Sequence, residues 1–136
     1  FDDYLEYFME ENISDFKVRT LNIFHSQEAI VGIQCVYVTD DEEIEAPARI
    51  AHNNNIKQSF IEFAPKEYIT EIFGELDQKE NLAALTIVTS MNKRINVGNP
   101  GVRKFRVNVP ASGYVLAGVG GSFRNRGIDS LYFYYI

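Results

Sequence analysis

The 136-residue chain contains no Trp, a single Cys, two Met and four Pro. The lone cysteine, Cys35, excludes an internal disulfide. It alternates with Ile33 and Tyr37, so we expect a small buried side chain in a strand. No apolar run reaches the ~18 residues that a transmembrane helix needs. The length is typical of one domain that is large enough for a core of its own.

Groups that carry catalysis or bind metals are also scarce. His25 and His52 lack any metal-ligand spacing, and we expect both to be polar residues at strand ends. The acidic run 40–43 lacks the EF-hand arrangement of acids and Gly, which favours a solvated turn. Gly118–Gly121 precedes no helical pattern, so it is not a phosphate-binding turn. No nucleophile motif is present. We therefore expect a non-catalytic protein without metal or cofactor.

Acidic residues are nearly absent from the C-terminal part of the chain. Residues 81–136 contain one acid, Asp129, and seven Lys or Arg, whereas residues 1–80 contain 18 acids and 6 bases. This asymmetry predicts either an anionic partner for the C-terminal part or mutual neutralisation of the two parts in the fold. Nucleic acid is disfavoured, because the net charge is −6 and no aromatic stacking motif is present.

Aromatic and β-branched residues are abundant, and they recur in one pattern. The octets Ile30–Tyr37, Leu82–Thr89 and Ile128–Tyr135 share the same order of apolar and polar positions. The shift that aligns the second octet with the third also aligns the residues that precede these octets. It places Ile61–Phe63 on Val107–Val109, and the match continues from there to the octets. Three copies of one β-unit are therefore predicted, with their apolar faces around a common axis.

The remaining pattern predicts an all-β domain of short strands separated by turns. Residues 1–14 form a separate N-terminal extension, in which the spacing of Phe1, Leu5, Phe8 and Met9 predicts a short helix. The domain itself is expected over residues 15–136. Strands are predicted over residues 17–25, 30–38, 46–51, 59–63, 68–74, 82–89, 94–97, 104–109, 114–120 and 128–135.

Three segments together resemble one family of proteins. They are Glu67–Gly74, the stretch Thr89–Gly101 with Asn92-Lys93-Arg94 in it, and Tyr114–Gly121 followed by Ile128–Leu131. In order and spacing they are similar to the jacalin-related lectins. The resemblance implies a β-prism of three four-stranded Greek-key sheets with pseudo-threefold symmetry. It also implies a non-catalytic domain that binds carbohydrate.

The family binds sugar through two elements. One is an N-terminal Gly-Gly loop, which these residues lack; the other is a Gly-x-x-x-Asp loop, which Asn125–Asp129 matches with Asn in place of Gly. The octets single out the same acid, because Asp129 stands where the other copies have Val31 and Ala83. A carboxylate can accept hydrogen bonds from two sugar hydroxyls. The predicted ligand-binding residues are Asp129, Gly127, Arg126, Asn125, Ile128 and Gly121. The alternative is that Asp129 caps the turn or pairs with Arg124 or Arg126.

Basic residues around this loop predict a second feature. They could form a patch for sulfated, sialylated or phosphorylated groups, which guanidinium groups bind with two hydrogen bonds. The alternative is ordinary solvated strand faces. The candidates are Arg124, Arg103, Lys104, Lys93, Arg94 and Arg106.

The expected partners are glycans, including anionic ones, or glycosylated or lipid surfaces, in a secreted or cell-surface setting. A homo-oligomer or a place in a larger chain stays open. An alternative function is a membrane- or receptor-targeting β-prism module of a larger pore-forming or perforin-like protein. The start at Phe1 instead of Met indicates an excised or processed domain and favours this alternative. A purely structural or oligomerisation domain is a third reading.

Overall fold

The computed structural model describes residues 1–2, 17–39, 42–51, 55–124 and 127–136. Every regular element in these ranges is a β-strand, and none of them contains a helix that could cross a membrane. The strands are β1 (Lys17–His25), β2 (Ile30–Val38), β3 (Glu43–Glu45), β4 (Arg49–Ile50), β5 (Lys57–Glu62), β6 (Ile69–Leu76), β7 (Leu82–Thr89), β8 (Arg94–Gly98), β9 (Arg103–Val107), β10 (Leu116–Arg124) and β11 (Gly127–Tyr135).

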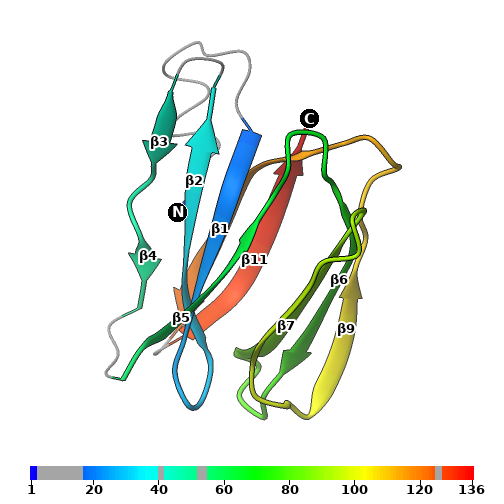
Figure 1. Ribbon diagram of the computed structural model, residues 1–136. Coiled ribbons are helices and arrows are strands. Elements are labelled where there is room, and N and C mark those ends of the chain that lie inside the picture. Colours follow the sequence, from blue (N-terminus) through cyan, green and yellow to red (C-terminus); the bar gives the residue numbers. More distant parts are fainter. Residues whose placement is uncertain (3–16, 40–41, 52–54, 125–126) are drawn as a thin grey trace.

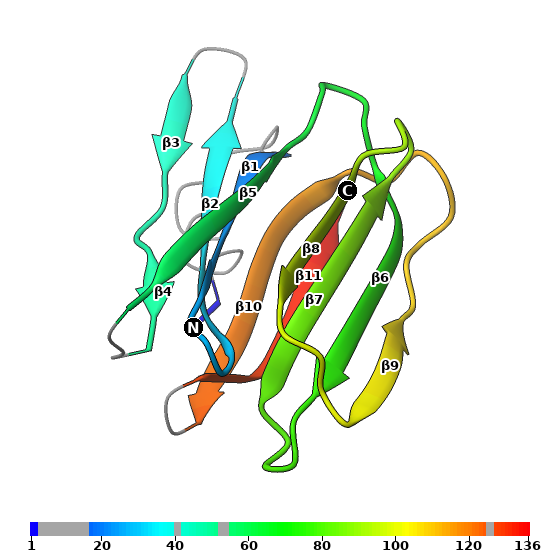
Figure 2. The same ribbon diagram turned by 60° about the horizontal axis from the view of Figure 1, so that its bottom comes forward.

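The strands form three antiparallel sheets, which together give the predicted β-prism (Figures 1 and 2). The first sheet has the order β3-β2-β1-β5, with β4 also paired to β2. The second has the order β8-β7-β6-β9, and the third consists of β10 and β11. Asp2 adds an antiparallel bridge to Gly120 on β10. Each octet thus forms the second strand of a hairpin: β2, β7 or β11.

The core lies between the sheets, where the octets direct their apolar positions. Ile33, Cys35 and Tyr37 of β2 are buried, as are Leu85 and Ile87 of β7. Alternation along a strand places these side chains on one face, as predicted. The equivalent residues of β11, Leu131 and Phe133, are only partly buried. The third sheet is therefore less completely covered than the other two.

Each hairpin contains a β-bulge at the same place in the repeat. The pairing register skips Val31 in β2, Ala83 in β7 and Asp129 in β11. A bulge inserts one unpaired residue and bends the strand locally. The repeat found in the sequence is therefore also a repeat of backbone geometry, and it includes the position of the β-bulge.

The three octets begin at one end of the prism. A Cβ on Gly127 would lie 3.4 Å from Cβ of Ala29 and 3.9 Å from Cβ of Asn81, and these three residues each precede an octet. The turn 26–29, the turn 77–81 and the β10–β11 hairpin thus meet at what we call the Asp129 end, at the bottom of Figures 1 and 2. The other end of the strands is called the opposite end.

Two predictions about local structure differ from the described chain. The acidic stretch before Ala46 was expected as a turn only, but β3 begins at Glu43. The strand predicted over 46–51 is reduced to Arg49–Ile50, because Pro47 has no backbone N–H with which to continue the ladder. The predicted N-terminal helix lies outside the described residues, except for Phe1 and Asp2, which run along β10.

Candidate functional site

Asp129 is an exposed carboxylate held on one side only. As the bulge residue of β11, it lies beside Ser122 of β10, whose Oγ donates a hydrogen bond to Asp129 Oδ1 at 2.5 Å. Ser130 Oγ lies 2.7 Å from Ser122 Oγ. Because a hydroxyl has one hydrogen, and Ser122 gives its own to Asp129, Ser130 donates to Ser122. The second carboxylate oxygen, Oδ2, has no hydrogen-bond partner among the residues the structure describes, and can accept one from a ligand.

Gly127 and Ile128, the two residues before Asp129, form the start of β11. Both are buried, and Gly127 packs against Ala29 and Asn81 at the pseudo-threefold axis. Gly127 pairs with Arg124, so the hairpin is tight. The predicted site residues Asn125 and Arg126 lie outside the described residues.

Gly121 has a structural role next to the site. A Cβ there would come within 2.4 Å of the Ser130 carbonyl oxygen, so the close approach of β10 and β11 requires glycine. Its backbone N–H donates to the Phe1 carbonyl, and its carbonyl accepts from the Phe1 nitrogen, each at 3.0 Å. Gly121 therefore anchors the N-terminal residues beside the site.

The N-terminal contact was missed by sequence reasoning. The Asp2 carboxylate accepts hydrogen bonds from Tyr132 at 3.1 Å and from Tyr134 at 2.5 Å. Burial, followed by its hydrogen bond to Asp2, raises the pKa of Tyr132. For Tyr134, its own hydrogen bond to Asp2 is the main cause of a raised pKa. The alternating Tyr132 and Tyr134 of β11 were a sequence signal for this contact. It was not recognised because their partner, Asp2, is more than a hundred residues away in the sequence.

Two of the predicted basic residues lie close to Asp129. Arg103 and Lys104 of β9 line a groove of about 430 Å³ together with Asp129 and Ser130. Arg103 pairs with Glu80 at 3.3 Å, whereas Lys104 is exposed and has no ion pair among the described residues. The groove floor is apolar and includes Leu131 and Phe133. The structure therefore places positive charge and the candidate carboxylate around one groove.

The other basic candidates do not join this group. Lys93 and Arg94 follow the far end of β7, so a strand of eight residues, roughly 25 Å, separates them from Asp129. Lys93 donates to the Glu62 carbonyl at 2.6 Å and to Glu67 at 3.2 Å. Arg106 pairs with Glu71 at 2.9 Å. Arg124 is exposed at the Asp129 end, and the described chain contains no ion pair between it and Asp129.

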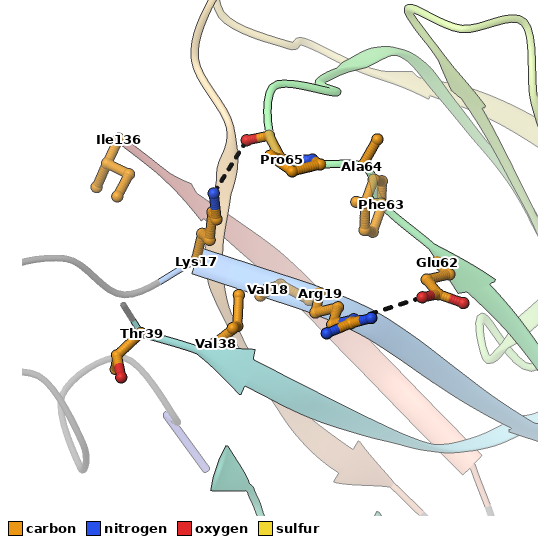
Figure 3. Close-up of a pocket in the computed structure, with 10 residues that line it drawn as sticks. All are labelled: Lys17, Val18, Arg19, Val38, Thr39, Glu62, Phe63, Ala64, Pro65 and Ile136. Carbon is orange, nitrogen blue, oxygen red and sulfur yellow. Dashed lines mark hydrogen bonds and ion pairs between the residues drawn. The ribbon is translucent and has the colours of Figure 1, made fainter. Parts of the chain in front are cut away.

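A larger hollow of about 720 Å³ lies at the opposite end, between the start of β1, the end of β2 and the segment after β5 (Figure 3). Its cations are already engaged: Lys17 donates to the Pro65 carbonyl at 3.1 Å, and Arg19 pairs with Glu62 at 3.4 Å. None of the residues predicted to bind ligand lines this hollow.

The remaining candidates are structural where they are described. Cys35 is buried in β2, as predicted. His25 ends β1, and burial, with a contribution from Lys57, lowers its pKa. Its Nε2 lies 3.4 Å from Ser59 Oγ. His52 lies outside the described residues. Within the described ranges, no three His, Cys, Asp or Glu side chains form a group that could hold a metal ion.

Comparison with known proteins gives the same architecture. The family model for the jacalin-like lectin domain matches residues 7–134. No curated protein matches the chain. Among solved structures, the galactose-binding lectin from champedak with Gal(β)1,3-GalNAc superposes with a TM-score of 0.76 at 20% identity, covering 99% of this chain and 96% of that one.

Two other solved structures agree at similarly low identity. The mannose-specific jacalin-related lectin from Morus nigra, in complex with mannose, has a TM-score of 0.75 at 17% identity and covers 99% of this chain and 84% of that one. Jacalin with melibiose has a TM-score of 0.73 at 20% identity, with coverages of 99% and 96%. At this identity the likeness concerns the fold, and together with the family match it shows that the chain belongs to the jacalin-like lectin domain family.

Proposed function

We propose that this domain binds carbohydrate without catalysis, at the Asp129 end of the prism. The observation that carries the proposal is the geometry of Asp129. One carboxylate oxygen is fixed by Ser122, and the other is exposed and without a partner among the described residues. A fixed, charged acceptor binds hydroxyl donors more strongly than a neutral one and costs little entropy to position.

The charge around the groove points to the class of glycan. Arg103 and Lys104 lie with Asp129 around one groove, so a sugar whose hydroxyls bind Asp129 can place a carboxylate or sulfate near these two cations. The proposed ligands are therefore glycans that carry an acidic group, as in sialylated or sulfated chains. Neutral sugars are expected to bind more weakly, because they offer no negative charge to Lys104, which has no ion pair among the described residues.

The decisive experiment is a glycan array on the wild type and on Asp129→Ala. The repeat itself supplies the substitution, since Ala83 occupies the same bulge position in β7. The variant is therefore expected to keep its fold and to lose binding by tenfold or more, about 1.4 kcal/mol or above, as for the loss of a charged hydrogen bond. Circular dichroism and thermal unfolding verify the fold.

The matched control is Glu28→Gln, which removes an exposed carboxylate from the equivalent turn of the first sheet. It should leave glycan binding unchanged. Equal loss in both variants would show that the carboxylate acts through net charge alone. No binding to any glycan, together with salt-sensitive binding to anionic vesicles, would replace this proposal with membrane targeting.

A further inference from the structure

The outer face of the third sheet carries two serines next to Asp129. Ser122 of β10 is the direct partner of Ser130 of β11, and partners on paired strands place their side chains on the same face. Asp129 shares this face, because its Oδ1 and Ser130 Oγ lie 2.5 and 2.7 Å from Ser122 Oγ. The bulge thus turns the candidate carboxylate towards the outer surface of the sheet.

Tyr132 is the next side chain along this face. Side chains alternate along a strand, so Tyr132 lies on the same side of β11 as Ser130, about 7 Å further along. Leu131, between them, packs against the core instead. Tyr132 is paired with Gly120 of β10. The outer face therefore leads from the Asp129 carboxylate, past two hydroxyl groups, to an aromatic ring.

The ring of Tyr132 is held in one orientation. A Cβ on Gly120 would lie 2.3 Å from Cε2 of Tyr132 and 2.6 Å from its hydroxyl oxygen, so the ring lies across the glycine. Its hydroxyl donates a hydrogen bond to Asp2 at 3.1 Å, and its ring packs edge-to-face with that of Tyr134, with the centroids 5.6 Å apart. Tyr132 is still 42% exposed, and because β10 covers one side of the ring, the exposed surface is on the other side.

A fixed, exposed aromatic face beside groups that bind hydroxyls suits a sugar ring. The C–H groups on one side of a hexopyranose form an apolar surface, and the negative face of an aromatic ring attracts their weakly positive hydrogens. Tyrosine makes such a contact at a low cost in conformational entropy, because it has two side-chain torsions, which the contacts of Tyr132 already restrain. Tyr132 can therefore contact the sugar that follows the one held by Asp129.

We propose that Tyr132 forms a second sugar subsite, in which the sugar linked to the acidic one lies against the exposed face of its ring. This subsite rests on the proposed function, since the acidic sugar must first be held by Asp129, near Arg103 and Lys104. The two cations belong to β9, whereas Tyr132 lies on the outer face of the third sheet. The subsite therefore selects a chain of at least two sugars over a single acidic sugar.

The test compares acidic oligosaccharides with their acidic sugar alone, by calorimetric titration of the intact protein. The probes are sialyllactose with the methyl glycoside of sialic acid, and lactose sulfated on its galactose with the same sulfated galactose. Tyr132→Leu should weaken binding of the oligosaccharide about three- to tenfold and leave binding of the single sugar unchanged. Tyr132→Phe keeps the ring face and should retain the preference for the longer chain.

The matched control is Tyr114→Leu, because Tyr114 is 50% exposed and precedes β10 at the opposite end of the prism; it should change neither affinity. If Asp129→Ala abolishes binding but Tyr132→Leu weakens both members of a pair equally, or neither, the subsite is wrong and the proposed function stands. An equal loss in Tyr132→Phe would also overturn the contact with the ring face. If the wild type binds no probe, or if Asp129→Ala binds as well as the wild type, the proposed function fails and the subsite with it.

Discussion

At the scale of single residues, Glu67 is an ionisable group whose side chain is completely buried. Its carboxylate accepts hydrogen bonds from the Thr89 hydroxyl, from the Ala64 N–H at 2.8 Å and from Lys93 at 3.2 Å. Burial alone would raise the pKa of Glu67, but these hydrogen bonds and the charge of Lys93 outweigh it and lower the pKa below its ordinary value. Glu67 joins the start of β6 to the β7–β8 turn.

Replacing this residue by a neutral analogue should therefore be costly. Glu67→Gln is expected to lower the free energy of unfolding by about 2 kcal/mol at pH 7, because charged hydrogen bonds to a buried group are lost. A carboxyl with a lowered folded-state pKa stabilises the protein above its unfolded pKa of about 4.3, and this contribution disappears as the pH falls through the folded value. Urea unfolding at pH 7 and at pH values below about 4 measures both effects.

The matched control for this prediction is Glu71→Gln. Glu71 is 38% exposed and pairs with Arg106 at the surface, so the change should cost well under about 1 kcal/mol. The stability gap between wild type and Glu67→Gln should narrow as the solution becomes acidic. If the difference in the free energy of unfolding stays constant with pH, the loss is explained by the shape of the side chain at position 67 and not by its charge.

At the residue scale, sequence reasoning selected Asp129 as a candidate but did not predict the residues that hold its carboxylate. Alignment of the octets singles out Asp129 against Val31 and Ala83, and the family resemblance points to the same residue. Its partners Ser122 and Ser130 were not predicted, because their contact depends on the register of β10 against β11 and on the bulge. A bulge is a property of two strands, and one strand's residue pattern does not reveal it.

At the scale of elements, the connection from β8 to β9 depends on one glycine. Gly98 has a φ of +94°, and a Cβ there would lie 2.1 Å from the Ala83 carbonyl oxygen. Asn99, the next residue, donates to that carbonyl. The glycine therefore lets the chain pass closely over the bulge of β7.

Gly98→Ala should destabilise the domain by at least about 2 kcal/mol, since it combines an unfavourable φ with a backbone clash. Gly113→Ala is the matched control: its φ is +97°, but no atom lies within 4 Å of the added Cβ. It should cost about 1 kcal/mol, from φ alone. Thermal unfolding of both variants measures the difference, and equal losses would show that the clash at Gly98 is relieved.

Strand positions were predicted well where hydrophobic alternation was regular. The bounds of β1, β2 and β7 agree with the predicted ranges to the residue. Around Pro47 the prediction was wrong, because a short edge strand is determined by pairing and by the missing N–H more than by its own pattern. The partial burial of Leu131 and Phe133 in β11 was not predicted, since octets of equal pattern imply equal burial.

At the scale of the whole molecule, the three sheets share a design but not an equal degree of burial. Leu85 and Leu131 occupy the same octet position, yet only Leu85 is fully buried. Leu85→Ala should cost about 3 kcal/mol or more, through lost apolar contact and a cavity. Leu131→Ala should cost roughly half of that, because less surface leaves contact with the core.

Urea unfolding of the two leucine variants gives the comparison directly. Equal costs would indicate that the third sheet is as well packed as the second, contrary to the burial of its side chains.

The charge asymmetry of the chain is resolved in part inside the fold. Lys93 pairs with Glu67, Arg103 with Glu80 and Arg106 with Glu71. Each pair joins a cation from residues 81–136 to an acid from residues 1–80, which agrees with the expected neutralisation of the two parts.

These three ion pairs bear on how the chain could be divided. A cut after Glu80 separates β6 from β7 and leaves one fragment of net charge −12 and one of +6. Opposite charges of this size attract over distances near the Debye length, so they speed encounter most at low salt. The turn between the two strands is therefore a natural place to split the domain into complementary halves that recognise each other.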